Sequence, residues 1–261
     1  MPTPLQILLD PVSLIVIAMY AALMVWEYFF PARQLEHVPN WRLRGLLAFI
    51  VYFFVSSYLP LFWDNSLAKL QLFNLTSWNV VSQTALALVV YEFVLYVWHR
   101  VMHSSPFLWK TFHQMHHSAE RLDTYGAFWL SPMDMIGFTF ISSFALVIII
   151  GIDAKAATAF IFITMFFAVF QHANIRTPRW LGYIVQRPES HSRHHGKNIH
   201  RDNYADLPIF DILFGTFYNP KDALATGFYS GASSRVIDML LFRDINKATQ
   251  STETNALAKE A

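Results

Sequence analysis

The sequence predicts an all-α integral membrane protein: a helical bundle with about five apolar spans, four at the least, and a histidine-rich cap on the cytoplasmic side. Three observations predict this class. Only 14% of the 261 residues are charged, against roughly 25% in an average soluble domain, and 54% are hydrophobic. Several apolar runs are long enough to cross a bilayer. The chain also contains 11 His and no Cys.

The spans follow from the length of the apolar runs, because a helix needs about 20 residues to cross roughly 30 Å of hydrocarbon. Residues 1–10 contain no Lys or Arg, unlike the start of a cleavable signal peptide, so we expect the first span to be retained. A short turn over 151–155 predicts that the last two spans form an antiparallel hairpin. The five expected spans are 12–30, 46–63, 80–98, 135–150 and 156–170.

The Lys and Arg residues predict the orientation. The segments 31–44, 99–134 and 173–261 carry 17 of the 19 positive residues. Alternating spans place these segments on one side, which the positive-inside tendency makes cytoplasmic. We therefore expect a multi-pass protein of the plasma (inner) membrane if bacterial, or of the endoplasmic reticulum if eukaryotic. All 11 His fall on this side or at its boundary, although no His was used to derive the topology.

Nine of these histidines form four groups with metal-ligand spacing. An HxxxH pair at helical i, i+4 spacing presents two imidazoles on one face, and two HxxHH boxes repeat the pattern. His172 stands alone where the last span ends. Nine nitrogens suit two ions with four or five ligands each, and imidazole favours iron, zinc, copper or nickel. The expected ligands are His99, His103, His113, His116, His117, His172, His191, His194 and His195.

Other residues near these boxes are candidates for supporting roles. Glu92 and Tyr96 share a helical stripe with the HxxxH pair, so we expect Glu92 to orient a ligating imidazole. His200 and Arg193 are further candidates beside the third box. Asn203 and Asp211 lie downstream of the boxes. His37 is expected to be an ordinary interfacial residue.

Composition and context exclude several function classes. A net charge of +1 leaves no basic footprint for nucleic acid, and the absence of Cys excludes iron–sulfur clusters and cysteine nucleophiles. A membrane haem between His99 and His113 is disfavoured, because Arg100, Pro106 and Lys110 interrupt the interval. No HExxH zinc-protease motif is present.

The boxes and their flanks resemble the fatty acid hydroxylase/sterol desaturase superfamily of integral-membrane di-iron enzymes. The similar segments are WHRVMHSSPFLWKTFHQMHHS, QHANI and HSRHHGKNIHRDNYADLPIFDILFGTFYNP, within 91–220. Two positions depart from the family pattern: Ser131 replaces a His before Pro132, and Arg176 stands where some members place another His. Within the similar block, Asn203 and Asp211 are expected to order the segment that returns the third box to the others.

The resemblance implies an oxidoreductase of the monooxygenase type that acts in lipid metabolism. It would hold two Fe ions, use O₂, and hydroxylate or desaturate a C–H bond of a sterol, fatty acyl chain, ether lipid or carotenoid. The chain contains no dinucleotide-binding GxGxxG motif, so electrons are expected from a separate redox partner. The implied organisation is transmembrane helices over 1–90, a catalytic domain over 91–220 and a tail over 221–261.

Two other functions fit the residues: a histidine-rich membrane protein that binds or transports metal, and a zinc-dependent membrane hydrolase.

In the tail, apolar spacing over 235–250 predicts an amphipathic helix, on the membrane surface or against the domain, and 251–261 is expected to be disordered.

Overall fold

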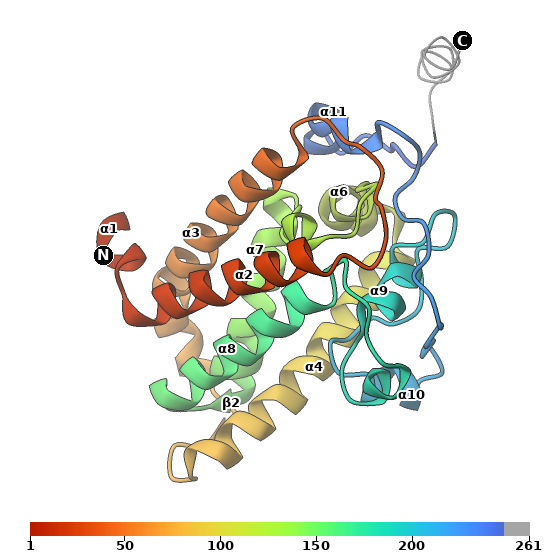
Figure 1. The fold of residues 1–261 in the computed structure, drawn as a ribbon. Coiled ribbons are helices and arrows are strands. Elements are labelled where there is room, and N and C mark those ends of the chain that lie inside the picture. The colour runs from red at the N-terminus through yellow and green to blue at the C-terminus, as the bar shows by residue number, and fades with distance from the viewer. Residues whose placement is uncertain (248–261) are drawn as a thin grey trace, which may run out of the picture.

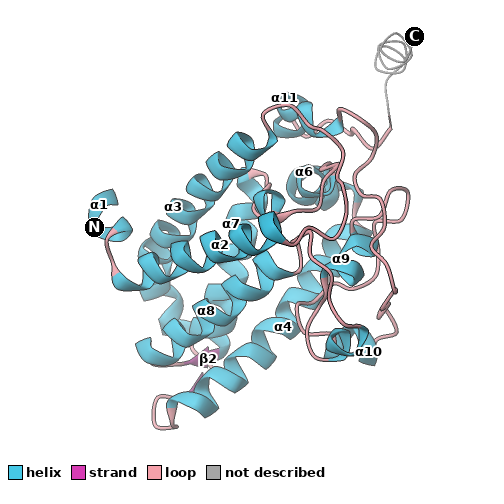
Figure 2. Cartoon of the chain, in the orientation of Figure 1, coloured by secondary structure: helices cyan, strands magenta, loops and turns pink. Residues whose placement is uncertain are grey.

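The computed structural model describes residues 1–247, which form a bundle of long helices with a cap of short helices and loops at one end (Figures 1 and 2). Four helices are long and apolar enough to cross a membrane, and α8 is a shorter apolar helix. Its 17 residues span roughly 25 Å. The predicted class, with four to five spans, is confirmed. The long elements are α2 (Pro11–Phe29), α3 (Trp41–Leu67), α4 (Val80–Ser104), α7 (Pro132–Ser143) with its π-helical continuation η4 (Phe144–Ile149), and α8 (Ala154–Phe170).

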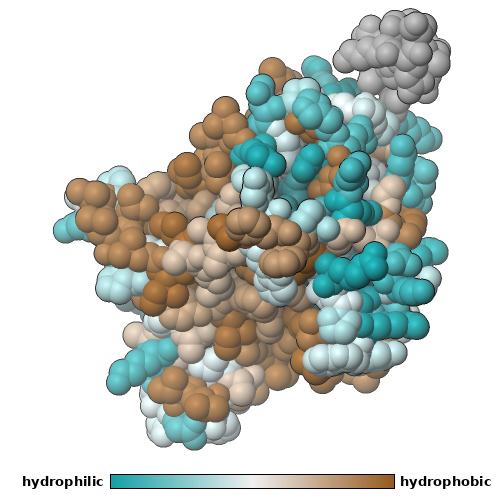
Figure 3. Space-filling view, viewed as in Figure 1, coloured by the Kyte–Doolittle hydropathy of each residue, from teal (hydrophilic) through white to brown (hydrophobic). Residues whose placement is uncertain are grey.

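Short elements fill both ends of the bundle. Two-residue strands β1 (Phe73–Asn74) and β2 (Ile150–Gly151) pair in parallel at one end. At the other, most of the short helices gather where α2, α4 and α8 end (Figure 1), and Figure 3 shows much of the hydrophilic surface at this end. The remaining elements are α1 (Pro4–Leu8), η1 (Ala68–Leu70), α5 (Pro106–Leu108), η2 (Trp109–His113), α6 (Gln114–His117), η3 (Thr124–Gly126), η5 (Arg179–Tyr183), α9 (Pro188–His194), α10 (Ile209–Leu213), η6 (Ala232–Ser234) and α11 (Val236–Leu240).

Polar side chains fix the ends of the spans. Asp153 caps α8 by accepting from the Ala156 N–H, and it also accepts from the Gln83 amide of α4 at 2.8 Å. At the opposite end, buried Glu27 accepts from the backbone N–H groups of Thr124 and Asn174. These contacts satisfy orphan backbone donors and lock the loops of the cap onto α2.

The expected α7–α8 hairpin is wrong in its packing, although the connecting turn is short. Helix α7 packs mainly against α3, whereas α8 packs mainly against α2 and α4. A cavity lined by residues of both helices lies between them.

The expected tail helix over 235–250 is wrong in its length: among the described residues it is limited to α11, and 248–250 lie outside them. Helix α11 ends at Leu240, and Phe242 adopts a left-handed backbone (φ 56°) that cannot continue a helix. Asp238 accepts from both Arg235 and Arg243 at 2.9 Å, which folds the chain back. Buried Met239 and Ile245 then belong to one apolar cluster with α6. The segment expected to be disordered, 251–261, lies outside the described residues.

Candidate metal centre

Nine imidazoles from four segments converge where the spans meet the cap. They divide into two groups, and within each group one nitrogen per residue lies within 4.8 Å of all the others. Eight of the nine are buried, and His103 is partly buried. The first histidine group is His99, His103, His113, His117 and His194; the second histidine group is His116, His172, His191 and His195.

The local backbone explains why one box serves both groups. Residues four apart on a helix lie on one face, whereas the residue between them at i+3 is turned away by about 100° from the residue at i+4. His113 and His117 join the first group while His116 joins the second. In α9, His194 joins the first group, and His195, which follows its last residue, joins the second. Neighbouring residues therefore point to different groups.

The outer nitrogen, Nδ1, of five imidazoles lies next to an acceptor oxygen at 2.6–2.9 Å. A carbonyl or carboxylate oxygen only accepts, so Nδ1 carries the proton and Nε2 keeps its lone pair. This is the tautomer in which imidazole binds a metal through Nε2. The acceptors are the carbonyl of Tyr204 for His99, of His200 for His103, of Ala168 for His172 and of Asp202 for His194, and the Asp134 carboxylate for His113.

The Nε2 atoms face one another at short range. His99 Nε2 lies 2.8 Å from His113 Nε2, although both Nδ1 atoms carry the proton. In the second group, 3.1 Å separates each Nε2 atom from the next in the series His116, His172, His191 and His195. The facing lone pairs of His99 and His113 repel unless a cation attracts both. Ligand nitrogens at right angles around an ion at roughly 2.1 Å lie about 3 Å apart, which matches these separations.

The electrostatic environment favours the neutral form of the imidazoles. Burial holds the pKa of His113, His117 and His195 well below the ordinary value of 6.5, and neighbouring imidazoles lower it further. Burial alone lowers the pKa of His200 to about 4. The imidazoles are therefore neutral near pH 7, which is the form that coordinates metal.

Several buried nitrogens have no hydrogen-bond partner among residues 1–247. In the first group these are the Nε2 atoms of His103, His117 and His194. Leaving a buried polar atom unpaired costs about 1–3 kcal/mol, so three together need compensation. A bound cation would supply it, and an all-nitrogen donor set suits a first-row transition metal better than Mg²⁺ or Ca²⁺.

Asp134 places its carboxylate against an imidazole, whereas Glu92 contacts the backbone of a loop. Glu92 Oε2 accepts from the backbone N–H groups of Asp206 and Leu207, so its expected contact with an imidazole is wrong. Asp134 Oδ2 lies 2.8 Å from His113 Nδ1, and both residues are fully buried. Sequence reasoning missed Asp134 because the only signal was an acidic residue in the first turn of α7.

The other candidates lie around the groups without joining them. Tyr96 contacts Thr216 and Arg100, not an imidazole. His200 Nδ1 lies 3.2 Å from His117 Nδ1, and its carbonyl accepts from His103. Arg193 donates to Asp202 and stacks over the Tyr218 ring, so it reaches His194 only through Asp202. His37 is exposed.

Asn203 and Asp211 order the loop that follows the third box. The Asn203 amide donates to the carbonyls of Ser190 and Tyr218 and accepts from the Tyr218 N–H. Asp211 accepts from the backbone N–H groups of Tyr204 and Ala205. Because the carbonyls of residues 200–204 hold three Nδ1 atoms of the first group, this loop fixes that group.

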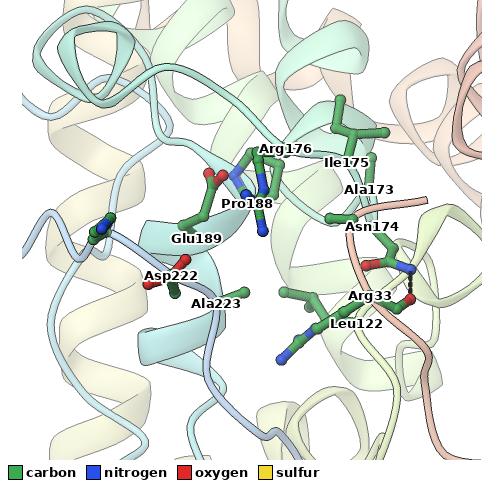
Figure 4. Close-up of a pocket in the computed structure, with 12 residues that line it drawn as sticks. Arg33, Leu122, Ala173, Asn174, Ile175, Arg176, Pro188, Glu189, Asp222 and Ala223 are labelled. Carbon is green, nitrogen blue, oxygen red and sulfur yellow. Dashed lines mark hydrogen bonds between the residues drawn. The ribbon is translucent and has the colours of Figure 1, made fainter. Parts of the chain in front are cut away.

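A small cleft of about 120 Å³ lies in the cap, and Figure 4 shows the residues that line it. It is lined by segments that follow the ends of α2 and α8 and by the start of α9, including Ala173, next to His172. Charges of both signs line it: Arg33, Arg176 and Lys221 are cationic, and Glu189 and Asp222 are anionic.

The fold and the site define a class: a multi-pass helical membrane protein with two clusters of buried imidazoles at one end of its spans. Within that class, the fatty acid hydroxylase family model matches residues 84–216, half of the chain, so the protein belongs to the fatty acid hydroxylase family. This match contains all nine histidines and confirms the resemblance expected from the boxes.

Two curated relatives are similar to the chain. Ornithine lipid hydroxylase OlsE of Rhizobium tropici is 32% identical over 154 residues, 57% of this chain and 46% of that protein. A cholesterol 25-hydroxylase-like protein of Danio rerio is 27% identical over 151 residues, 54% of this chain and 57% of that protein. The chain thus spans about half the length of the curated relatives it matches. No solved structure matches it.

Proposed function

We propose that this protein is a membrane-bound, O₂-dependent lipid hydroxylase that holds two iron ions, one in each histidine group. The observation that carries the proposal is the division of nine imidazoles, eight of them buried, into groups of five and four with short Nε2–Nε2 separations. Membership of the fatty acid hydroxylase family supports the same reaction class.

The bound iron would supply O₂ activation for attack on an unactivated C–H bond. In hydroxylation one oxygen atom enters the C–H bond, and the other is reduced to water with two electrons and two protons. The chain contains no Cys, so iron–sulfur chemistry is unavailable to it, and we propose that a separate redox protein supplies the electrons.

The residues of this chain hold the geometry and exclude water. Tyr204, Asp202 and Asp134 keep the Nδ1 protons in place, so each Nε2 stays oriented without an entropy cost at the moment of binding. Burial of the site limits the reaction of an oxidant with solvent. No side chain needs to act as a nucleophile.

The substrate is proposed to be an amphipathic lipid. The relatives are named for an ornithine lipid and for cholesterol, so these two are the first substrates to test. The cleft with both signs of charge favours a zwitterionic head group such as that of an ornithine lipid over an uncharged sterol. We place the histidine end on the cytoplasmic side, where 17 of the 19 positive residues gather.

The test uses detergent-purified full chain reconstituted with a reductant and each lipid. We expect about two irons per chain and a product heavier by one oxygen atom, which carries the label when ¹⁸O₂ is supplied. Product formation must stop without O₂ or without reductant.

Other outcomes identify the alternatives. Zinc in place of iron with turnover that needs no electrons would indicate a hydrolase. Metal binding with no change in any lipid, with or without O₂, would indicate a metal-binding or transport protein. Either result contradicts the proposal.

A further inference from the structure

A cavity of about 510 Å³ lies inside the bundle of spans, between α2, α3, α7 and α8. It is larger than the charged cleft and predominantly apolar in its lining. An apolar lining at membrane depth favours a hydrocarbon chain as the ligand, because a soluble metabolite would lose its hydration there.

The lining residues on α3 form one stripe along the helix axis. They fall at 49, 52, 53, 56, 57, 60 and 64, which is one face over four turns. The fifteen residue-to-residue steps from 49 to 64 extend roughly 22 Å, so the cavity is elongated along the spans. Such a shape suits an extended alkyl chain better than a compact head group.

One end of the cavity lies at Ala168, one helical turn before His172 of the second histidine group. Lining residues on α8 follow at Ala157, Ile161, Thr164 and Ala168, and the next position in this series is His172. The Ala168 carbonyl accepts from His172 Nδ1 at 2.6 Å, so a cavity wall and a candidate ligand are in direct contact.

The opposite end is polar. Asp64 lies near the end of α3, and its buried Oδ1 has no hydrogen-bond partner among the described residues. Ser143 of α7 lines the same end and accepts from the Trp63 indole at 2.9 Å. Contact with an unpaired carboxyl group is unfavourable for a methyl terminus, so this end limits how far a chain extends.

We propose that this cavity binds the alkyl chain of the lipid substrate, with the chain terminus toward Asp64 and the carbons nearer the head group at the Ala168 end. The Asp64 end then sets the longest chain that binds. This inference rests on the proposed lipid hydroxylase function and adds the chain site and its direction. The direction follows from charge: the head group stays at the end where the charged cleft and the histidines lie.

The first test locates the chain without turnover. Palmitic acid with a diazirine at its terminal carbon is irradiated with the full chain in lipid nanodiscs, and the adducts are mapped by mass spectrometry. We expect adducts at the Asp64 end, on Ser57, Pro60 or Leu146. Adducts from the terminal carbon at Phe128 or Ala168, or on lipid-facing residues alone, would overturn the proposal.

The second test changes the cavity length. Ala157→Phe narrows the cavity on α8 about four turns from His172, and Asp64→Ala removes the polar end. Competition of saturated fatty acids against the probe should show weaker binding of stearic acid to Ala157→Phe, by roughly tenfold, the affinity carried by about two buried methylene groups. Decanoic acid should bind unchanged. Asp64→Ala should instead favour the longer chains.

Ala22→Phe is the matched control, since Ala22 is exposed on α2 and lines no cavity found in the described part of the chain. Equal loss of all chain lengths in Ala157→Phe, or the same change in Ala22→Phe, would refute the assignment. Cross-linking and competition need neither iron nor O₂. Their failure would therefore leave lipid hydroxylation standing, and failure of hydroxylation would leave the chain site standing.

Discussion

The two histidine groups differ in how the protein holds them. In the first group, four of five imidazoles donate from Nδ1 to an oxygen, three of these to carbonyls of the 200–204 loop. In the second group only His172 does so; His191 lies beside the Gln186 amide at 3.1 Å, and the Nδ1 atoms of His116 and His195 have no partner in ordinary hydrogen-bond geometry within residues 1–247.

This difference separates a rigid group from a less constrained one. The first group is fixed by Asp134 and by a loop that Asn203 and Asp211 order. The second group borders the cavity in the bundle through Ala168. Fewer outer contacts leave its imidazoles freer to adjust, which is useful on the side where we place the substrate. The contrast gives the following predictions.

The largest effect is expected from removing one imidazole of each group. His194→Ala and His195→Ala change neighbouring residues that belong to different groups. Each should lower iron from about two to about one per chain and reduce hydroxylation at least 100-fold, because a ligand contributes more than its outer partners. Iron is measured by mass spectrometry of the purified protein. Exposed His37→Ala is the control; retention of both irons in either variant contradicts the division into groups.

A smaller effect is expected from the outer contacts of the two groups. Asp134→Leu should weaken iron binding about 10- to 100-fold, since His113 loses the partner that fixes its proton. Gln186→Leu should cost less, because the second group depends less on such contacts. Competition with an iron chelator measures both affinities.

Asp134→Asn is the matched variant, because an amide oxygen can still accept from His113. It should recover most of the affinity lost in Asp134→Leu. If Gln186→Leu weakens iron binding more than Asp134→Leu, the proposed contrast in rigidity is reversed.

Asp211→Ala tests the loop rather than the metal. It removes the acceptor of two backbone N–H groups, on Tyr204 and Ala205, and should lower the free energy of unfolding by about 1–3 kcal/mol. Thermal unfolding in detergent measures this. Protein that remains folded should still load iron; a folded variant without iron would give Asp211 a direct role in binding.

The smallest effect is expected for Arg193→Gln. The Arg193–Asp202 ion pair is partly exposed, with side chains 19% and 22% accessible, and such pairs contribute less than about 1 kcal/mol. The hydroxylation rate of this variant in a steady-state assay should stay within about twofold of the rate of the original protein. The reason is that His194 Nδ1 contacts the Asp202 carbonyl and not its carboxylate. A loss comparable to that of Asp134→Leu would show that Arg193 acts on the site itself.

Prediction from the sequence succeeded where the signal is local. Apolar length placed the spans within a few residues, for example 80–98 against α4 at Val80–Ser104, because hydrocarbon thickness dictates helix length. The prediction failed for 235–250. The apolar residues there have helical spacing, but the contacts of Asp238 and the left-handed backbone of Phe242 fold the chain back after α11. Glu92 failed for a similar reason: sharing a stripe with His99 does not decide which partner a carboxylate meets.

By itself the sequence determined the membrane bundle and the nine histidines, since hydropathy and i, i+4 spacing are properties of short segments. Only the tertiary structure decided which imidazole joins which group, that Asp134 supports His113, and that a cavity separates α7 from α8. These features join segments far apart in the chain, such as His99 with Tyr204, and depend on helix rotation and packing.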